Sequence, residues 1–285
     1  MRNYYYVILA AISVGTIGLF VKLVGDSLPP MVLNFYRIFF GLITLAIICP
    51  IIDKNTFKLK KKDVLMYLLI GFLVALSMSL TNIAYLNSPV QNVTLIMSIT
   101  PFFVLLFAYY LLKEKITKAK LITLFIAIVG LVVLNPFQAE GTLGNFLALA
   151  VAGLDGIMVV LLRKEDKTHS IGDAFWFLFF ALLFLIPFPI AQGFYTPSLT
   201  IILLGVITAG LQFLFLNLAL EKVEAEISSI MGIIITPFIA ITLAYFFLDE
   251  ALTFQIILGG AILIFAGIYM ETHSLRKKRK QSASA

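Results

Sequence analysis

The stretch TLIMSITPFFVLLFAYYLLKEKIT, residues 94–117, is repeated in outline by IMGIIITPFIAITLAYFFLDEALT, residues 230–253. The spacing between the two is constant at 136 residues, and nine of the 24 positions are identical. Apolar helices share Ala and Leu by chance, but Thr-Pro-Phe, Tyr, Glu and Thr at matched positions indicate an internal repeat. The sequence therefore predicts a chain built from two related halves.

The composition predicts a protein that is embedded in lipid. Hydrophobic residues make up 61% of the 285 residues, charged residues only 13%, and the mean hydropathy is +1.05. A soluble domain is about 45–50% apolar and about 25% charged. Here ten apolar runs recur, each near the ~20 residues that a helix needs to cross a bilayer.

These runs favour helices over the ~10-residue segments of alternating polarity that build a membrane β-barrel, because they are longer and continuously apolar. We therefore predict an all-α integral membrane protein with ten transmembrane helices, arranged as two five-helix repeats. The predicted spans are residues 4–24, 31–52, 64–86, 91–112, 119–135, 144–162, 172–192, 199–220, 227–248 and 254–270.

Basic residues set the predicted orientation. With the N-terminus in the cytoplasm, 19 of the 21 Lys and Arg residues fall in inner segments and none in outer loops. Both termini are then cytoplasmic, and five spans per half make the second half inverted. The predicted units are residues 1–137, residues 143–273, and a basic cytoplasmic tail, 274–285, that ends in a disordered segment from Gln281 to Ala285. The default location is the plasma membrane.

The paired stretches Thr100-Pro101 to Thr117 and Thr236-Pro237 to Thr253 resemble the Pro-then-Glu signature of the drug/metabolite transporter superfamily, in its EamA branch. The ten-span layout, the half-chain repeat and Arg37 in the second span also resemble that family. The sequence departs from it at Lys113 and Asp249, where many members have Gly before the Glu. The resemblance implies a secondary transporter that moves amino acids and other small metabolites, usually outward, through a central cavity.

The main alternative is an integral-membrane enzyme that acts on a lipid or lipid-linked substrate. No H-E-x-x-H, G-x-S-x-G, P-loop or C-x-x-C motif occurs, and the lone Cys49 cannot build a multi-cysteine metal site. We therefore predict no catalytic residues, cofactor or metal. The net charge of +6 reflects topology rather than nucleic-acid binding. Expected partners are a small metabolite, the bilayer, protons as a coupling ion and a second copy of the chain in a homodimer.

Pro101 and Pro237 lie about ten residues into their spans, and hence about 15 Å deep, near the middle of the bilayer. Proline removes a backbone hydrogen bond and displaces the carbonyl four residues earlier, here on Met97 and Ile233. Such a carbonyl must find a partner or line a cavity. A packing kink is one interpretation, and a hinge that lines a cavity is the other.

Two charged residues within spans are candidates for binding. Asp155 is predicted near the membrane middle, where a carboxylate is costly and functional by default; it could bind a substrate ammonium or a coupling proton, or hold helices together. Arg37 could grip an anionic group of the substrate, or reach the outer water boundary along its own stem. Lys22 and Asp26, four residues apart, predict an ion pair at the outer mouth.

Neutral polar residues form stripes at helical spacing, which predicts a polar cavity between the halves. The stripes lie on the third, fourth, eighth and ninth spans: Ser77-Thr81 with Asn82-Tyr85, Thr94-Ser98-Pro101, Thr208-Gln212, and Ser229-Gly232-Thr236. Inter-helix hydrogen bonds in the membrane use the same residue types, so each stripe alone is weak evidence. Glu114 and Glu250 are interpreted as structural residues at the water boundary, and Thr117 and Thr253 as caps of the helices that follow. The predicted substrate-binding residues are Arg37, Asn82, Tyr85, Ser98, Pro101, Asp155, Trp176, Gln212, Thr236 and Pro237.

Overall fold

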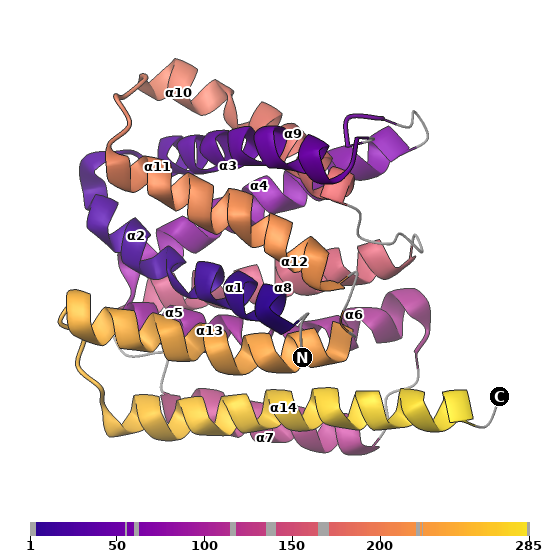
Figure 1. The fold of residues 1–285 in the computed structure, drawn as a ribbon. Coiled ribbons are helices and arrows are strands. Elements are labelled where there is room, and N and C mark those ends of the chain that lie inside the picture. The colour runs from indigo at the N-terminus through magenta and orange to yellow at the C-terminus, as the bar shows by residue number, and fades with distance from the viewer. Residues whose placement is uncertain are drawn as a thin grey trace.

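A computed structural model describes residues 4–54, 56–59, 63–114, 118–134, 141–164, 171–220, 223 and 225–283. This part of the chain folds into helices and contains no strand (Figure 1). The elements are α1 (Tyr4–Gly15), α2 (Ile17–Val24), the 3-10 turn η1 (Gly25–Ser27), α3 (Pro30–Ile52), α4 (Val64–Asn87), α5 (Val90–Met97), α6 (Thr100–Leu112), α7 (Lys118–Leu134), α8 (Thr142–Lys164), α9 (Ile171–Leu185), α10 (Pro187–Gln192), α11 (Leu199–Gly205), the π-helix η3 (Val206–Leu211), α12 (Gln212–Leu220), α13 (Ala225–Phe247) and α14 (Phe254–Ala283).

The helices fall where the apolar runs of the sequence predict them. Seven helical segments in the described residues are long and apolar enough to cross a membrane: Tyr4–Ser27, Pro30–Ile52, Val64–Asn87, Val90–Leu112, Thr142–Lys164, Gly172–Gln192 and Leu199–Ala219. Three shorter apolar helices, Leu121–Val133, Met231–Phe247 and Phe254–Tyr269, coincide with the remaining predicted spans. The structure thus confirms an all-helical protein with several membrane-length helices, and the count of ten spans stays a prediction.

Four of these segments are not continuous α-helices. The first is interrupted at Thr16, the fourth by a turn at Ser98 and Ile99, and the sixth at Ile186, just before Pro187. The seventh segment, Leu199–Ala219, is interrupted by η3, in which the backbone widens to a π-helix for residues 206–211. A π-helix is rare and is frequently found at functional sites, so the interruption at η3 is the most informative of the four.

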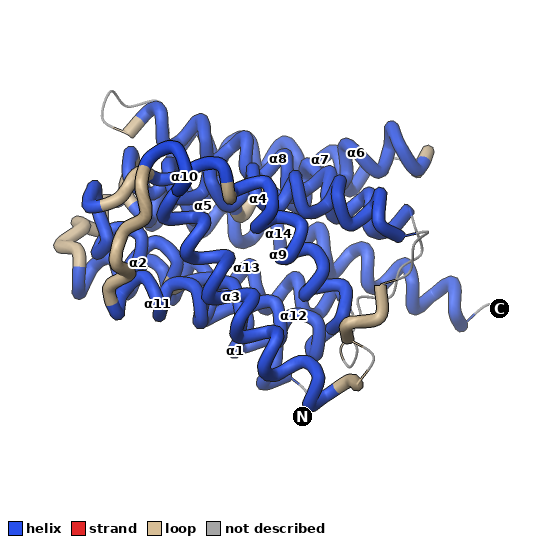
Figure 2. Tube along the Cα trace, turned by 90° about the horizontal axis from the view of Figure 1, so that it is seen from above, coloured by secondary structure: helices blue, strands red, loops and turns tan. Residues whose placement is uncertain are grey.

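The helices lie roughly along one direction, with α7 and α14 packed together as a separate layer at the bottom of Figure 1. Near the middle, α4 packs against both α8 and α9, and α3 packs against α9, α11 and η3. In Figure 1, α1 begins and α14 ends toward the right of the bundle, and Figure 2 shows the same direction from above. The opposite end holds the short connections before α3, α5 and α14.

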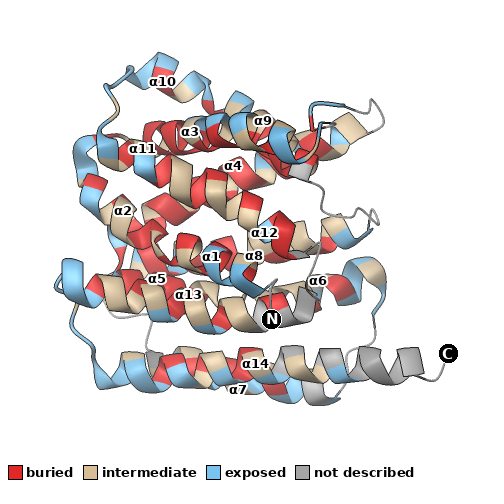
Figure 3. Cartoon of the chain, viewed as in Figure 1, coloured by how far each residue is buried: buried red, intermediate tan, exposed pale blue. Residues whose placement is uncertain are grey.

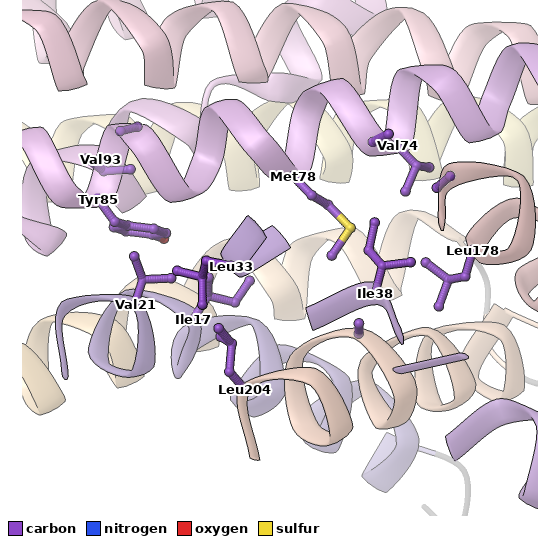
Figure 4. Close-up of a cluster of buried hydrophobic side chains, with 14 of the residues drawn as sticks. Ile17, Val21, Leu33, Ile38, Val74, Met78, Tyr85, Val93, Leu178 and Leu204 are labelled. Atoms are coloured by element: carbon purple, nitrogen blue, oxygen red, sulfur yellow. The ribbon is translucent and has the colours of Figure 1, made fainter. Parts of the chain in front are cut away.

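The apolar core lies where α2, α3, α4, α5, α9 and α11 meet. Figure 3 shows buried residues along the inward faces of these helices, and exposed ones along the outward faces of α7 and α14. In the close-up of Figure 4, Ile17, Val21 and Leu33 lie between Tyr85 and Leu204, and Ile38, Met78 and Leu178 form a second group. Helices that are apolar on all sides expose the remaining apolar side chains outward, as membrane helices do.

Two predictions from the sequence are wrong: the ion pair between Lys22 and Asp26, and the disordered segment that begins at Gln281. Lys22 and Asp26 form no ion pair, because α2 ends at Val24 and Asp26 lies in the turn η1, so the four-residue helical spacing does not apply. The tail is not disordered up to residue 283, because α14 continues as a helix through Ala283. Residues 284 and 285 lie outside the described part of the chain.

The cap predicted for α14 is confirmed. Ile256 N donates to Oγ1 of Thr253 at 3.3 Å, so the threonine side chain satisfies a backbone donor at the start of that helix. Its predicted counterpart, Thr117, lies outside the described residues.

Candidate functional site

Arg37 of α3 is the most buried charged side chain that the structure describes, with 2% of the residue exposed. Its Nε donates to Oγ1 of Thr208 at 2.9 Å, and its Nη2 donates to the Thr208 carbonyl oxygen at 3.2 Å. Its Nη1 donates to Oδ1 of Asn82 at 3.0 Å. The guanidinium therefore stays inside the bundle, where it joins α3 to α4 and to η3, and it does not reach the water boundary.

Within the described part of the chain, this guanidinium has no carboxylate partner. No Asp or Glu of the described residues forms an ion pair with Arg37, which means that none lies within 4.0 Å of it. A guanidinium has five N–H donors, and three of them are engaged here. The adjacent Asn82 is fully buried, and its Nδ2 has no hydrogen-bond partner.

The consequence is an electrostatic imbalance. Burying a charge costs several kcal/mol unless an opposite charge and hydrogen bonds compensate it. At Arg37 the hydrogen bonds are present and the opposite charge is not. The free N–H groups of Arg37 and the Nδ2 of Asn82 together could donate to an anionic oxygen.

Sequence reasoning missed the partner that holds Arg37 in place. Thr208 belonged to a polar stripe but was not among the predicted substrate-binding residues. It lies in the π-helix η3, and its hydroxyl also donates to the Leu204 carbonyl at 2.6 Å. The signal in the sequence was the Thr208–Gln212 spacing, but no apolar periodicity reveals a π-helix. Gln212 opens α12, and its buried Oε1 has no partner.

Tyr85, Thr94 and Ser98 are brought together between α4 and the break after α5. The hydroxyls of Tyr85 and Thr94 lie 3.1 Å apart, and both residues are buried. Ser98 donates from its Oγ to the Thr94 carbonyl at 3.0 Å, within its own helix. Thr94 and Ser98 of the fourth predicted span therefore lie together, and Tyr85 of the third joins them; Pro101 follows the break in the helix.

Asp155 of α8 is half-buried and contacts Ser77 of α4, whose Oγ donates to Oδ1 of the carboxylate at 2.6 Å. Ser77 and Asn82 are five residues apart on α4, and hence about 140° apart around the helix and about 7.5 Å along it. Arg37 and Asp155 therefore contact different faces of α4. The structure forms two polar sites, one around each charge.

The matched prolines have different backbone environments. The helix breaks before Pro101, and the Met97 carbonyl, predicted to be freed, accepts a hydrogen bond from Oγ1 of Thr100 at 2.8 Å. Pro237 remains inside the continuous helix α13. There Thr236 donates instead across to the Ala11 carbonyl of α1, at 3.3 Å.

Trp176 of α9 lies in an aromatic cluster with Tyr67, Phe175, Phe179 and Phe180. Its indole Nε1 is buried and has no hydrogen-bond partner. A buried indole N–H normally finds a partner, so this donor is available to a ligand. No group of three His, Cys, Asp or Glu residues within the described ranges is placed to hold a metal ion.

A comparison with known families gives one match, repeated along the chain. The family described as the EamA-like transporter family matches residues 1–135 and again residues 142–272. The two matches together cover nearly the whole sequence, and each corresponds to one predicted half.

Curated relatives are similar over nearly their full length. An uncharacterized transporter of Archaeoglobus fulgidus is 27% identical and is aligned over 92% of this chain and 93% of its own. The S-adenosylmethionine uptake transporter of Rickettsia bellii is 26% identical over 90% of each chain. The pseudopaline exporter CntI of Pseudomonas aeruginosa is 24% identical over 92% of this chain and 93% of its own.

One solved crystal structure has the same fold. It aligns with a TM-score of 0.67 over 96% of this chain and 98% of that chain, at 15% sequence identity. At that identity the likeness concerns the fold alone.

Proposed function

Because the chain belongs to the EamA-like transporter family, we propose that it is a secondary active transporter that exports small metabolites such as amino acids. It crosses the plasma membrane ten times as two inverted five-helix repeats, residues 1–137 and 143–273, with both termini and the basic tail, residues 274–285, in the cytoplasm. The two repeats rock about a central site, which opens to each side in turn.

Helix packing supports the inverted repeat. The first helix of each half packs against the fourth span of the other half. In this way α1 of the first half packs on α13, and α8 of the second half packs on α5 and α6. Likewise α3 packs on α11 and η3, and α9 packs on α4. The two separate matches of one family, one to each half, agree with this symmetric packing of the halves.

Arg37 carries the proposal for the substrate. It is buried, it has no carboxylate partner among the described residues, and Asn82 beside it has a free donor. Two convergent donor groups with net positive charge suit a carboxylate, which a guanidinium binds through two oxygens. The substrate therefore carries a carboxylate, and its entry supplies the charge that the protein lacks.

Asp155 provides the second polar site. Its carboxylate has one neutral hydrogen-bond partner, Ser77, and no basic partner among the described residues. It binds either the ammonium group of an extended substrate or a coupling proton. Because α4 separates it from Arg37, a proton site apart from the carboxylate site suits the geometry better for a small amino acid.

The remaining predicted residues line the path between the halves. Gln212 and Trp176 offer an acceptor and a donor that have no partner in the protein. Ser98, Pro101, Thr236 and Pro237 lie on the matched fourth spans, which pack against each other through α5 and α13. Relatives named for uptake and for export both occur, so the outward direction rests on the family resemblance of the sequence.

Thermal unfolding of the purified protein in detergent tests the substrate class. Amino acids, organic acids, amines and nucleotide sugars are compared, because a ligand at about 100 times its Kd adds about 2.7 kcal/mol of stability. A shift with carboxylates that disappears in Arg37→Ala supports the proposal. Uptake into proteoliposomes is then measured for each stabilising solute. A carboxylate that stabilises both proteins equally, or transport that Arg37→Ala leaves unchanged, contradicts the assignment of Arg37.

A further inference from the structure

Four hydrogen bonds join the connection between α13 and α14 to the start of α5, at the end of the bundle opposite to the termini. The carboxylate of Glu250 accepts hydrogen bonds from Val90 N through Oε1, at 2.7 Å, and from Gln91 N through Oε2, at 3.3 Å. In return, Gln91 Nε2 donates to the carbonyl oxygens of Glu250, at 3.2 Å, and Ala251, at 3.5 Å. Residues about 160 positions apart in the sequence thus bind each other reciprocally.

Glu250 supplies a cap that α5 does not have within its own sequence. The residue before α5 is Pro89, which offers no side-chain hydrogen bond to the first turn. The free N–H groups of a helix start favour a negative charge, and Glu250 places its carboxylate on two of them. Gln91 is fully buried by the contact. The carboxylate from one half therefore stabilises the first turn of a helix in the other half.

The backbone that presents Glu250 recurs at the opposite end of the bundle. Asp249 and Lys113, 136 residues apart, both adopt a left-handed conformation, with φ of 54° and 55°. The next residue then donates its N–H back into the helix, from Glu250 N to Ala244 O and from Glu114 N to Ala108 O, at 3.2 Å in both cases. Each fourth span therefore ends in the same turn, which directs a glutamate out of the helix.

Tyr85 connects this contact to the candidate site. Tyr85 lies one turn after Asn82 on α4, and its hydroxyl lies 3.1 Å from that of Thr94, one turn after Gln91 on α5.

We propose that Glu250 and Gln91 form the outer gate of the transporter, defined as the reciprocal contact of these two residues with Val90 and Ala251. In the described structure this gate is closed. It must open for the central site to face outward, which rests on the proposed alternating access. Glu250 and Gln91 are thus positioning residues that set the balance between the closed and open outer sides, rather than groups that touch the substrate.

The gate is tested by the reactivity of a cysteine at position 94 in a Cys49→Ser background. Thr94 is buried on α5 directly behind the gate, so Thr94→Cys reacts with a membrane-impermeant maleimide, added outside intact cells, only when the outer side opens. Glu250→Gln removes the negative charge of the acceptor, and Gln91→Ala removes both side-chain hydrogen bonds of Gln91; the loss of such hydrogen bonds shifts a two-state equilibrium by about tenfold. We expect Glu250→Gln and Gln91→Ala each to raise the labelling rate by about that factor.

Two controls accompany the test. Thr196→Cys places a cysteine in the exposed connection before α11, and its labelling shows that this end of the protein faces the medium. We expect this cysteine to react with the maleimide at the same rate in every variant. Glu114→Gln alters the equivalent turn at the opposite end and leaves external labelling of the position-94 cysteine unchanged.

The outcomes separate the gate from the transport function. Unchanged labelling in both Glu250→Gln and Gln91→Ala, in proteins that elute as the wild type does in gel filtration, overturns the gate even if transport is normal. Increased labelling in both variants supports the gate even if no tested solute is transported, and the proposed substrate class then fails separately. Equal increases in Glu114→Gln would mean a general loosening of the fold and would also overturn the gate.

Discussion

Gly156 of α8 lies so close to Phe103 of α6 that a Cβ atom added to the glycine would stand 2.6 Å from the Phe103 Cβ. Gly15 of α1 has the same relation to Ile239 of α13, where the corresponding distance would be 2.8 Å. Phe103 and Ile239 are 136 residues apart, the spacing of the sequence repeat. A close glycine contact therefore brings α1 against α13 and α8 against α6.

This contact predicts that Gly156→Ala destabilises the protein. An added methyl group would collide with Phe103, and overpacking of this kind costs about 1–3 kcal/mol. The measurement is the thermal unfolding midpoint in detergent. Gly153→Ala, one turn earlier, is the matched control, because its Cβ would meet Phe103 only at 3.7 Å. A Gly153→Ala variant that unfolds at the same temperature as Gly156→Ala would argue against close packing at this interface.

Substitution of Arg37 is expected to weaken carboxylate binding by tenfold or more, because charge-assisted hydrogen bonds to the ligand are lost. Arg37→Lys restores the charge but not the planar set of donors, so its affinity should fall between those of the wild type and Arg37→Ala. Isothermal titration with a stabilising carboxylate measures the three Kd values. Lys22→Ala is the control, since Lys22 has no ion-pair partner in the structure. Equal affinities for all four proteins would assign Arg37 to the support of η3 alone.

Asp155→Asn is expected to remove the pH dependence of transport if this carboxylate carries the coupling proton. Asparagine keeps the size and can still contact Ser77, but it cannot exchange a proton. Initial rates in proteoliposomes are measured across a series of pH gradients for both proteins. Ser77→Ala keeps the carboxylate and should keep the pH dependence. If Asp155→Asn responds to pH as the wild type does, the residue serves packing between α4 and α8.

Trp176 is the single tryptophan of the sequence, so the intrinsic fluorescence of the protein reports on one place. Its buried Nε1 has no partner, and a ligand near α9 would change its surroundings. We expect a saturable change in emission during titration with a transported solute, with the Kd that calorimetry gives. Trp176→Phe should abolish the signal and leave the Kd within a few-fold. A flat titration with a solute that binds by calorimetry would place Trp176 outside the site.

Which segments are helical could be predicted from the sequence, because apolar length alone decides whether a segment can satisfy its backbone in lipid. The interruptions could be predicted only in part. Pro101 coincides with a break, whereas Pro237, in an equivalent sequence, stays within a helix. Its neighbour Thr236 bonds to α1, while Thr100 bonds to its own helix. Sequence identity at the two prolines therefore did not determine the same backbone.

The candidate site shows the same division. Arg37, Asn82 and Asp155 stood out because polar and charged side chains are rare within apolar spans. The hydrogen-bond partners of these residues could not be predicted from the sequence, since Thr208 is 171 residues from Arg37 and Ser77 is 78 residues from Asp155. The ion pair expected between Lys22 and Asp26 does not form, because the helix ends at Val24 and Asp26 lies in the turn that follows.

By itself, the sequence determined that this chain is a helical membrane protein with a duplicated half and that a few charged residues lie within its spans. These properties follow from the hydropathy of each segment and from identities at a fixed spacing, both of which are local. Only the tertiary structure decided that Arg37 has no counter-ion among the described residues, that Asp155 contacts another face of α4 and that Glu250 caps α5. These depend on which helix faces meet, and the orientation of a helix around its axis is set by packing against distant segments.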